Sequence, residues 1–331
     1  MKKVLWLLAF GFWLLALMFP IVYSIPLSVS AQKNKGQFSL GIYPPIFEIN
    51  AQAPANIDAK INIQNLSEFS QNLSITFKSF RPDEKGDGTL RYEAAPPTLQ
   101  KIKVYDGENP LEQITLDPFE SRDLALKMDI ESNTPGGDYY FSVIFLSQEN
   151  QDSKISQSKI TGGIGTNVIL SVGRKGPFRG QIKEFSIPRL VTHGPVPITL
   201  LLANNSSYYL NPTGRIIIQD MFHREAGQIN ILPQYVLANS SRFMKDSDQA
   251  SPTFERAAQI ERLESDHPVL IWPETFLFGL YTAYAHIKLS ENGPVFETKA
   301  SFIAIPAYML FAISFLAFVL IGIYLRVKKK I

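Results

Sequence analysis

The chain has 331 residues, of which 45% are hydrophobic and 19% are charged, with 32 basic and 30 acidic side chains and no cysteine. The lack of cysteine excludes a disulfide-stapled domain and any cysteine-ligated metal or thiol-nucleophile site. The hydrophobic content and near-neutral charge exclude disorder as the dominant state and give no support to nucleic-acid binding. A chain of this length indicates about two domains.

The first 31 residues have the three regions of a secretory signal peptide. Two lysines precede an unbroken apolar run over residues 4–19, and residues 29–31 (VSA) fit a small-residue cleavage site. We therefore predict a signal peptide that is cleaved after Ala31. The alternative is an uncleaved N-terminal membrane anchor, because residues 4–23 are just long enough to span a bilayer.

From residue 32 to 175 the sequence predicts one β-sandwich domain. Apolar and polar residues alternate along most of its strand-like segments, which is typical of strands with one face on a core. Residues 139–146 (YYFSVIFL) are more continuously apolar and indicate a central strand. At least seven strands, separated by turn-forming residues, indicate an antiparallel sandwich. The expected strands include residues 38–42, 57–63, 73–77, 124–130, 139–146 and 166–172.

A break at residues 173–177 (GRKGP) precedes a second sandwich, which we place over residues 176–301. Ser251 can cap a short helix, and residues 255–264 (ERAAQIERLE) are strong helix formers. We therefore predict a partly helical insertion near residues 245–267. Strands are expected at residues 181–187, 196–203, 214–218, 228–232, 276–289 and 295–302.

The segment Phe302 to Leu325 contains no charged residue. As a helix rising ~1.5 Å per residue, it is long enough to cross a hydrocarbon core of roughly 30 Å. A basic tail (326–331) follows, and such a cluster belongs in the cytoplasm. A buried core helix is the alternative, but it accounts for neither the terminal position nor the tail. The anchoring cations are Arg326, Lys328, Lys329 and Lys330.

The predicted fold class is therefore all-β, with two tandem immunoglobulin-like β-sandwiches, an N-terminal signal helix and one C-terminal transmembrane helix over residues 302–325. The chain is expected in the cell membrane as a single-pass protein, with residues 32–301 outside and the C-terminus in the cytoplasm. The lipid bilayer is its first expected partner. Nucleic acid is not expected as a partner, and the sequence leaves the oligomeric state open.

No catalytic, metal or cofactor site is predicted. The four histidines form no metal-binding pair; His286 lies in a strand-like segment and His223 in a turn-like one. Residues 162–165 (GGIG) precede a strand and not a helix, which favours close strand packing over a phosphate cradle. Residues 83–88 (DEKGDG) lack the spacing of a calcium loop and indicate a solvated hairpin turn.

Tyr208 and Tyr209 are the candidates for ligand binding. They follow the polar turn 204–207 (NNSS), and exposed aromatic rings at this position can stack against a sugar. The alternative is the buried start of a strand. Turn chemistry also accounts for the asparagines of the five Asn-x-Ser sequons. These asparagines are Asn65, Asn72, Asn204, Asn205 and Asn239.

Eight short segments carry a resemblance to a known family. They are residues 40–48 (LGIYPPIFE), 61–65 (INIQN), 135–140 (PGGDYY), 204–205 (NN), 212–214 (PTG), 236–237 (VL), 241–242 (SR) and 278–281 (FGLY). Together they resemble the WxL-interacting surface proteins of bacteria. The resemblance implies a signal peptide, two immunoglobulin-like domains and a C-terminal membrane helix with a basic tail, and the first domain of that family is described as peptidoglycan-binding. Periplasmic pilus chaperones are a more distant relative in architecture.

Two classes of non-enzymatic function follow. The first is a membrane-anchored surface module that binds cell-wall polymer or another surface protein. The second is a membrane-tethered spacer or assembly chaperone, which acts on an exported partner by adding a strand to a sheet edge. A hydrolase with paired carboxylates remains as a third reading, for which the sequence offers no motif.

Overall fold

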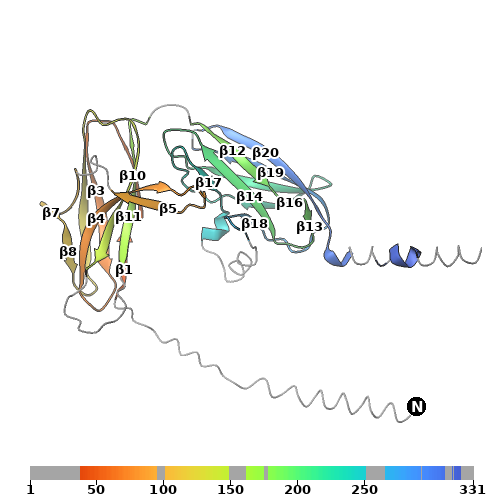
Figure 1. Cartoon of the computed structure of the whole chain (residues 1–331), viewed down its shortest axis with the longest axis horizontal. Helices are drawn as coiled ribbons and strands as arrows, with labels where there is room; N and C mark the ends of the chain where they lie inside the picture. The colour runs from red at the N-terminus through yellow and green to blue at the C-terminus, as the bar shows by residue number, and fades with distance from the viewer. Residues whose placement is uncertain are drawn as a thin grey trace, which may run out of the picture. The chain divides into compact units, whose positions relative to one another are not determined.

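The structure is a computed structural model of the whole chain. It describes residues 38–94, 101–148, 162–174, 178–250, 265–291, 293–309, 315 and 317–321. The expected signal peptide, its cleavage site after Ala31 and the basic tail all lie outside these residues. The described residues form two successive β-sandwiches, which confirms the all-β class (Figure 1).

The first sandwich packs two sheets against each other. One sheet has the strand order β1-β3-β9-β6-β7, and the other has the order β2-β11-β10-β4-β5, with β8 also paired to β4. The strands are β1 (Leu40–Tyr43), β2 (Ile46–Ala51), β3 (Ala55–Asn65), β4 (Gln71–Pro82), β5 (Leu90–Ala94), β6 (Ile102–Asp106), β7 (Asn109–Leu111), β8 (Gln113–Leu116), β9 (Ser121–Ile130), β10 (Gly137–Ser147) and β11 (Gly163–Val172).

The core of this sandwich follows the sequence pattern. Leu124, Leu126 and Met128 of β9 are buried in the core, whereas Ala125 and Lys127 between them are only half-buried. Because successive side chains of a strand alternate between faces, this arrangement is what the period-2 pattern predicts. β10 lies between β11 and β4, which confirms the central strand expected at residues 139–146.

The second sandwich also has two sheets around its own core. Their orders are β12-β14-β17, with β18 also paired to β14, and β13-β20-β19-β15-β16. The strands are β12 (Gly180–Ser186), β13 (Leu190–Val191), β14 (Val196–Asn204), β15 (Thr213–Asp220), β16 (Glu225–Asn230), β17 (Ser241–Phe243), β18 (Leu270–Trp272), β19 (Gly279–Lys288) and β20 (Val295–Ala304).

Neither sandwich is wholly antiparallel, which corrects the expectation. β2 pairs in parallel with β11, and the short β13 pairs in parallel with β20. In the first sandwich the chain leaves one sheet after Tyr43, crosses through Pro44 and Pro45, and enters the other sheet as β2. This crossing places β2 beside β11, running in the same direction.

The C-terminal end differs from the expected boundary at residue 302. Strand β20 continues to Ala304, because Phe302 pairs with Tyr281 and Ile303 with Leu280. Phe302 is also 1% exposed, inside the core. Residues 307–309, 315 and 317–321 are helical, and much of the predicted span is not described. Within the described part of the chain, no helix is both long enough and apolar enough to cross a membrane.

The predicted insertion near residues 245–267 is described only at its ends. Ser247–Ala250 form a short 3-10 helix, and the helix expected from Ser251 lies outside the described residues. At the other end, the His267 ring stacks on Phe243 of β17, with 4.2 Å between ring centroids. Both ends of the insertion are therefore held close to the sheet of β17.

Candidate functional site

The candidate residues Tyr208 and Tyr209 lie in a turn that Asn204 organises. The side-chain amide of Asn204 donates to the carbonyls of Tyr208 (2.8 Å) and Val236 (2.8 Å), and its oxygen accepts from the Ser206 N–H (2.8 Å). Asn204 is 1% exposed. A side chain that satisfies backbone groups on two separate segments fixes the turn rigidly.

This turn is packed against the first sandwich. Tyr209 is 5% exposed, and its hydroxyl donates to Glu48 of β2 (2.8 Å). The guanidinium of Arg174 lies 4.2 Å from the centroid of the Tyr209 ring and also donates to the Tyr209 carbonyl (3.0 Å). Tyr208 donates to the carbonyl of Gly173 (2.9 Å). The exposed aromatic patch considered for sugar stacking is therefore an interface between the sandwiches.

Two carboxylates of the first sandwich hold the second. Glu48 accepts from the hydroxyls of Tyr209 and Tyr235, and Asp138 accepts from the Tyr140 hydroxyl (2.7 Å) and from the backbone N–H of Tyr209. Burial, reinforced by the hydrogen bond to Glu48, raises the pKa of Tyr209 to about 12. Burial likewise raises the pKa values of Tyr140 and Tyr235. The tyrosines thus remain protonated donors at neutral pH.

The hairpin between β4 and β5 joins the same interface. Its Gly86 carbonyl accepts from the N–H of Phe243 in β17 (2.8 Å). Asp83 pairs with Arg91 (3.0 Å), whose hydrogen bond lowers the pKa of the Asp83 carboxyl. Residues 83–88 form the predicted hairpin turn, but part of it is buried against the second sandwich and not fully solvated. Sequence reasoning had no signal for this contact.

The first sandwich contains a turn with the same hydrogen bonds. The amide of Asn65 donates to the carbonyls of Phe69 (2.7 Å) and Asp117 (2.9 Å), and its oxygen accepts from the Ser67 N–H (3.0 Å). Asn65 is also 1% exposed. The predicted turn chemistry of the sequons is confirmed here and at Asn204, since both side-chain nitrogens already serve backbone carbonyls.

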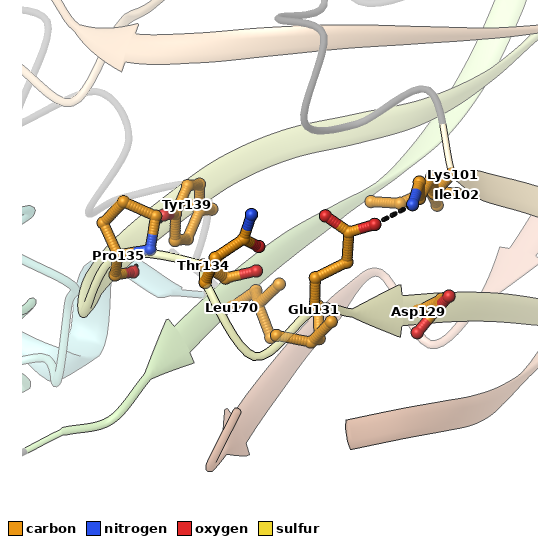
Figure 2. Close-up of a pocket in the computed structure, with 10 residues that line it drawn as sticks. Lys101, Ile102, Asp129, Glu131, Thr134, Pro135, Tyr139 and Leu170 are labelled. Atoms are coloured by element: carbon orange, nitrogen blue, oxygen red, sulfur yellow. Dashed lines mark hydrogen bonds and ion pairs between the residues drawn. The ribbon is translucent and has the colours of Figure 1, made fainter. Parts of the chain in front are cut away.

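A cavity of about 380 Å³ opens at the β9–β10 end of the first sandwich (Figure 2). Ile102, Ile130 and Leu170 form an apolar base, and each is buried. Tyr139 stands at one side, where its hydroxyl donates to the Pro135 carbonyl (2.9 Å). Burial of an apolar base beneath a polar rim suits a small hydrophobic group.

The carboxylates at this cavity do not form a catalytic pair. Figure 2 shows the Glu131 carboxylate turned toward Lys101, with which it forms an ion pair, while Asp129 lies apart from them. Two carboxyl groups that perform glycoside hydrolysis must flank one bond, and these two do not converge. Across the described ranges, no group of three or more His, Asp or Glu side chains is placed to hold a metal ion.

The histidines and the glycine cluster have the structural roles predicted for them. His286 of β19 pairs with Glu297 of β20 (3.0 Å), and His223 occupies the β15–β16 turn with a φ of 60°. Residues 163–165 belong to β11. A Cβ on Gly165 would lie 3.0 Å from the Val143 carbonyl oxygen, so glycine permits the close approach of β10.

Two strand edges lie side by side at one flank of the first sandwich. β1 is the edge strand of its sheet, and β2 pairs with β11 only from Asn167 onward. Among the described residues, no strand pairs with Gly163–Thr166 on the side away from β10. The Phe38 ring lies against Gly162 at one end, and the Thr166 hydroxyl donates to the Pro44 carbonyl (2.7 Å) at the other. We call β1 and residues 163–166 the open seam.

The open seam lacks the features that protect other edges. It contains no charged residue, and Gly163 and Gly165 present exposed backbone without side chains. By contrast, β5 carries Arg91 and Glu93, β12 has a bulge beside Lys183, and β16 begins at Glu225 with a bulge in its pairing. Charges and bulges discourage pairing with another chain, so the open seam is a site where an added strand meets little opposition.

Comparisons with known proteins give likenesses of architecture only. No protein-family model matches the chain, and no curated protein matches it. Among solved structures, the class 5 fimbriae chaperone CfaA is 12% identical with a TM-score of 0.38, covering 81% of this chain and 100% of its own. The E. coli chaperone DraB is 11% identical with a TM-score of 0.35, covering 79% of this chain and 98% of its own. A PapD-like domain of human CEP192 is 6% identical with a TM-score of 0.31, covering 46% of this chain and 98% of its own.

Proposed function

We propose that this protein is a non-enzymatic, membrane-tethered module that binds another exported protein by strand addition at the open seam. One observation carries the proposal: the seam combines an edge strand with a bare, uncharged stretch of backbone. Backbone hydrogen bonds supply affinity in strand addition, and flanking side chains supply selectivity. Tyr43, at the end of β1, is 72% exposed and is available for such a contact.

A protein partner fits the seam better than a cell-wall polymer does. Polysaccharide recognition uses accessible aromatic faces, and the ring of Tyr209 is covered by Arg174. The seam instead offers peptide groups that pair with no strand among the described residues, and such groups complement another peptide. Membership of the WxL-interacting family stays a prediction from sequence, and so does the peptidoglycan binding that it implies.

Membrane attachment through the C-terminal segment is part of the proposal. Its described helical residues expose large apolar side chains, including Phe315 (70%), Phe318 (75%) and Ile321 (58%). Such exposure is unfavourable in water and favourable in a hydrocarbon core. The uncharged sequence from residue 305 to 325 and its basic tail support the same assignment.

Photo-crosslinking on the full-length, membrane-bound chain tests the proposal. A photoreactive amino acid at Tyr43 is expected to capture one exported protein, whereas the same group at Tyr92, 53% exposed on the charged strand β5, is not. Gly41→Lys adds a charge to β1 and is expected to abolish the Tyr43 adduct. A Cβ at Gly41 meets only ordinary contacts, the nearest at 3.6 Å, so the fold is retained.

The matched control is Gln181→Lys, which adds a charge to β12, an edge that already carries Lys183. It is expected to leave the Tyr43 adduct unchanged. Equal adducts at Tyr43 and Tyr92, or an adduct that survives Gly41→Lys, would overturn strand addition at the seam. Sedimentation of the full chain with purified cell-wall polymer, unaffected by Gly41→Lys, would favour the polymer-binding alternative.

A further inference from the structure

Exposed apolar side chains gather at one end of the second sandwich. Leu190 of β13 pairs with Ile303 of β20, which pairs with Leu280 of β19, so the three side chains form a row across neighbouring strands. Their exposed fractions are 54%, 47% and 47%. The next residue inward on β20, Phe302, faces the core instead, as strand alternation requires.

Two loops extend this row with aromatic rings. Phe276 (61% exposed) and Phe278 (55%) flank Leu277, which is only 3% exposed and anchors the loop, so both rings remain outside. Phe222 (68%) lies in the β15–β16 turn. That turn is adjacent, because its Met221 side chain lies so close to Gly279 that a Cβ there would be 2.3 Å away.

These side chains form an apolar end face, which we define as Leu190, Phe222, Phe276, Phe278, Leu280 and Ile303. Soluble surfaces normally scatter single apolar residues and do not cluster several large ones. An arginine borders the face: the guanidinium of Arg224 lies 5.1 Å from the centroid of the Phe222 ring and also pairs with Asp220 (2.7 Å). Phenylalanine and leucine side chains beside basic residues are found where proteins bind at the boundary between lipid and water.

The C-terminal apolar segment leaves the sandwich at this same end. Strand β20 ends at Ala304, and the N–H of Ile305 bonds to the Val191 carbonyl of β13 (2.9 Å). Only Pro306 separates that bond from the first helical residue, Ala307. Since one residue spans at most about 3.6 Å, the end face cannot lie far from the start of the helix.

We infer that the apolar end face rests on the lipid bilayer, with its phenyl rings among the headgroups, and so fixes the second sandwich against the membrane. This inference rests on the proposed membrane anchor. A protein partner would need to bind where the bilayer already lies, so lipid is the occupant that the chain connection favours. The rings then bury apolar area in the boundary region, as interfacial anchors do.

The absence of cysteine allows a direct test on the full chain. Single-cysteine variants Phe222→Cys and Phe278→Cys, each carrying a nitroxide label, are reconstituted in vesicles of phosphatidylcholine and phosphatidylglycerol. Matched controls are Phe69→Cys and Phe119→Cys, which are 50% and 66% exposed on the first sandwich. Leu320→Cys, in the apolar helix, reports on the anchor itself.

Labels on the end face are expected to collide with a water-soluble nickel chelate roughly tenfold less often than the control labels, and to collide more often with oxygen dissolved in the lipid. All four positions are exposed, so labelling should preserve the fold, which the thermal unfolding midpoint of each variant checks.

Three outcomes would overturn the inference in distinguishable ways. Labels at 222 and 278 that are as accessible to the chelate as those at 69 and 119, with the label at 320 in lipid, would refute the end face and leave the anchor intact. A water-accessible label at 320 would refute the anchor as well. Protection at 222 and 278 that persists without vesicles would identify a protein contact and exclude lipid as the occupant.

Discussion

The two sandwiches use the same asparagine-centred turn in different surroundings. Asn65 and Asn204 each close a turn with the residue four positions later and clamp a second segment through the same amide. In the second sandwich, the turn is covered by the first sandwich. In the first sandwich, Leu66 and Phe69 of the turn are 53% and 50% exposed.

The difference shows that the shape of the turn does not determine which part of the molecule packs against it. The asparagine fixes the shape of each loop through hydrogen bonds to backbone groups. All of these bonds lie within one sandwich, so the shape does not depend on the other sandwich. What the loop then contacts depends on residues elsewhere, such as Glu48 and Arg174 for the second sandwich. Rigid turns can therefore be duplicated along a chain while the surfaces they present diverge.

The largest expected effect comes from removing the shared feature. Asn65→Ala and Asn204→Ala should each lower the free energy of unfolding by about 3 kcal/mol, since each leaves buried backbone groups without partners. Urea unfolding of the full chain in detergent micelles measures this loss. Asn205→Ala, at an exposed neighbouring position, is the control and should have no effect. A loss at only one of the two asparagines would show that the turns are not equivalent.

The contribution of the contact between the sandwiches to stability can be tested at the aromatic residue four positions after each asparagine. Tyr208→Ala should cost about 2 kcal/mol, because it removes a half-buried ring and its bond to Gly173, whereas Phe69→Ala should cost less than about 0.5 kcal/mol. The same unfolding measurement compares them. Equal costs would mean that contact between the sandwiches adds nothing to stability at this position.

Alkaline pH should weaken the covered turn through Tyr209. The tyrosine pKa is 10.0 when unperturbed, whereas folded Tyr209 keeps its proton to about 12. The unfolded chain therefore releases this proton first, and the free energy of unfolding should fall as pH rises from 10 to about 12. Tyr209→Phe should reduce the slope in that window, as measured by unfolding at several pH values. If the pH dependence of the free energy of unfolding is unchanged in Tyr209→Phe, other titrating groups cause the loss of stability.

The smallest effect on stability is expected from removing a surface charge at the cavity of the first sandwich, away from both turns. Lys101→Ala breaks an exposed ion pair with Glu131, and such pairs contribute little in water. The thermal unfolding midpoint should not change measurably. Ile102→Ala at the buried base of the same cavity is the contrast, and should lower the midpoint clearly.

Most long strands could be predicted from sequence, whereas several of the shortest could not. β3 and β9 alternate over ten residues or more, which leaves a clear period. β7, β13 and β17 have three residues or fewer, so their pairing depends on neighbours that other parts of the chain supply. The parallel pairing of β2 with β11 escaped prediction for a different reason, because the alternation of apolar and polar residues does not reveal the direction of a strand.

The candidate site was less predictable than the fold. The sequence drew attention to Tyr208 and Tyr209, but their burial depends on Glu48, which is 161 positions away from Tyr209. No local pattern encodes such a distance. The open seam was likewise hidden, since an edge exists only once the neighbouring strands have been placed. Its uncharged sequence, LGIY in β1 and GIGT in β11, is the signal that was available.

The placement of β20 determines how the molecule withstands mechanical tension. A pull on the C-terminal segment acts on Ala304, at the opposite end of β20 from Val295. The hydrogen bonds to β19 are perpendicular to that direction over ten residue pairs. A load that enters at Ala304 and is directed along β20 therefore shears these bonds together, whereas a load directed across the sheet would peel them apart one by one.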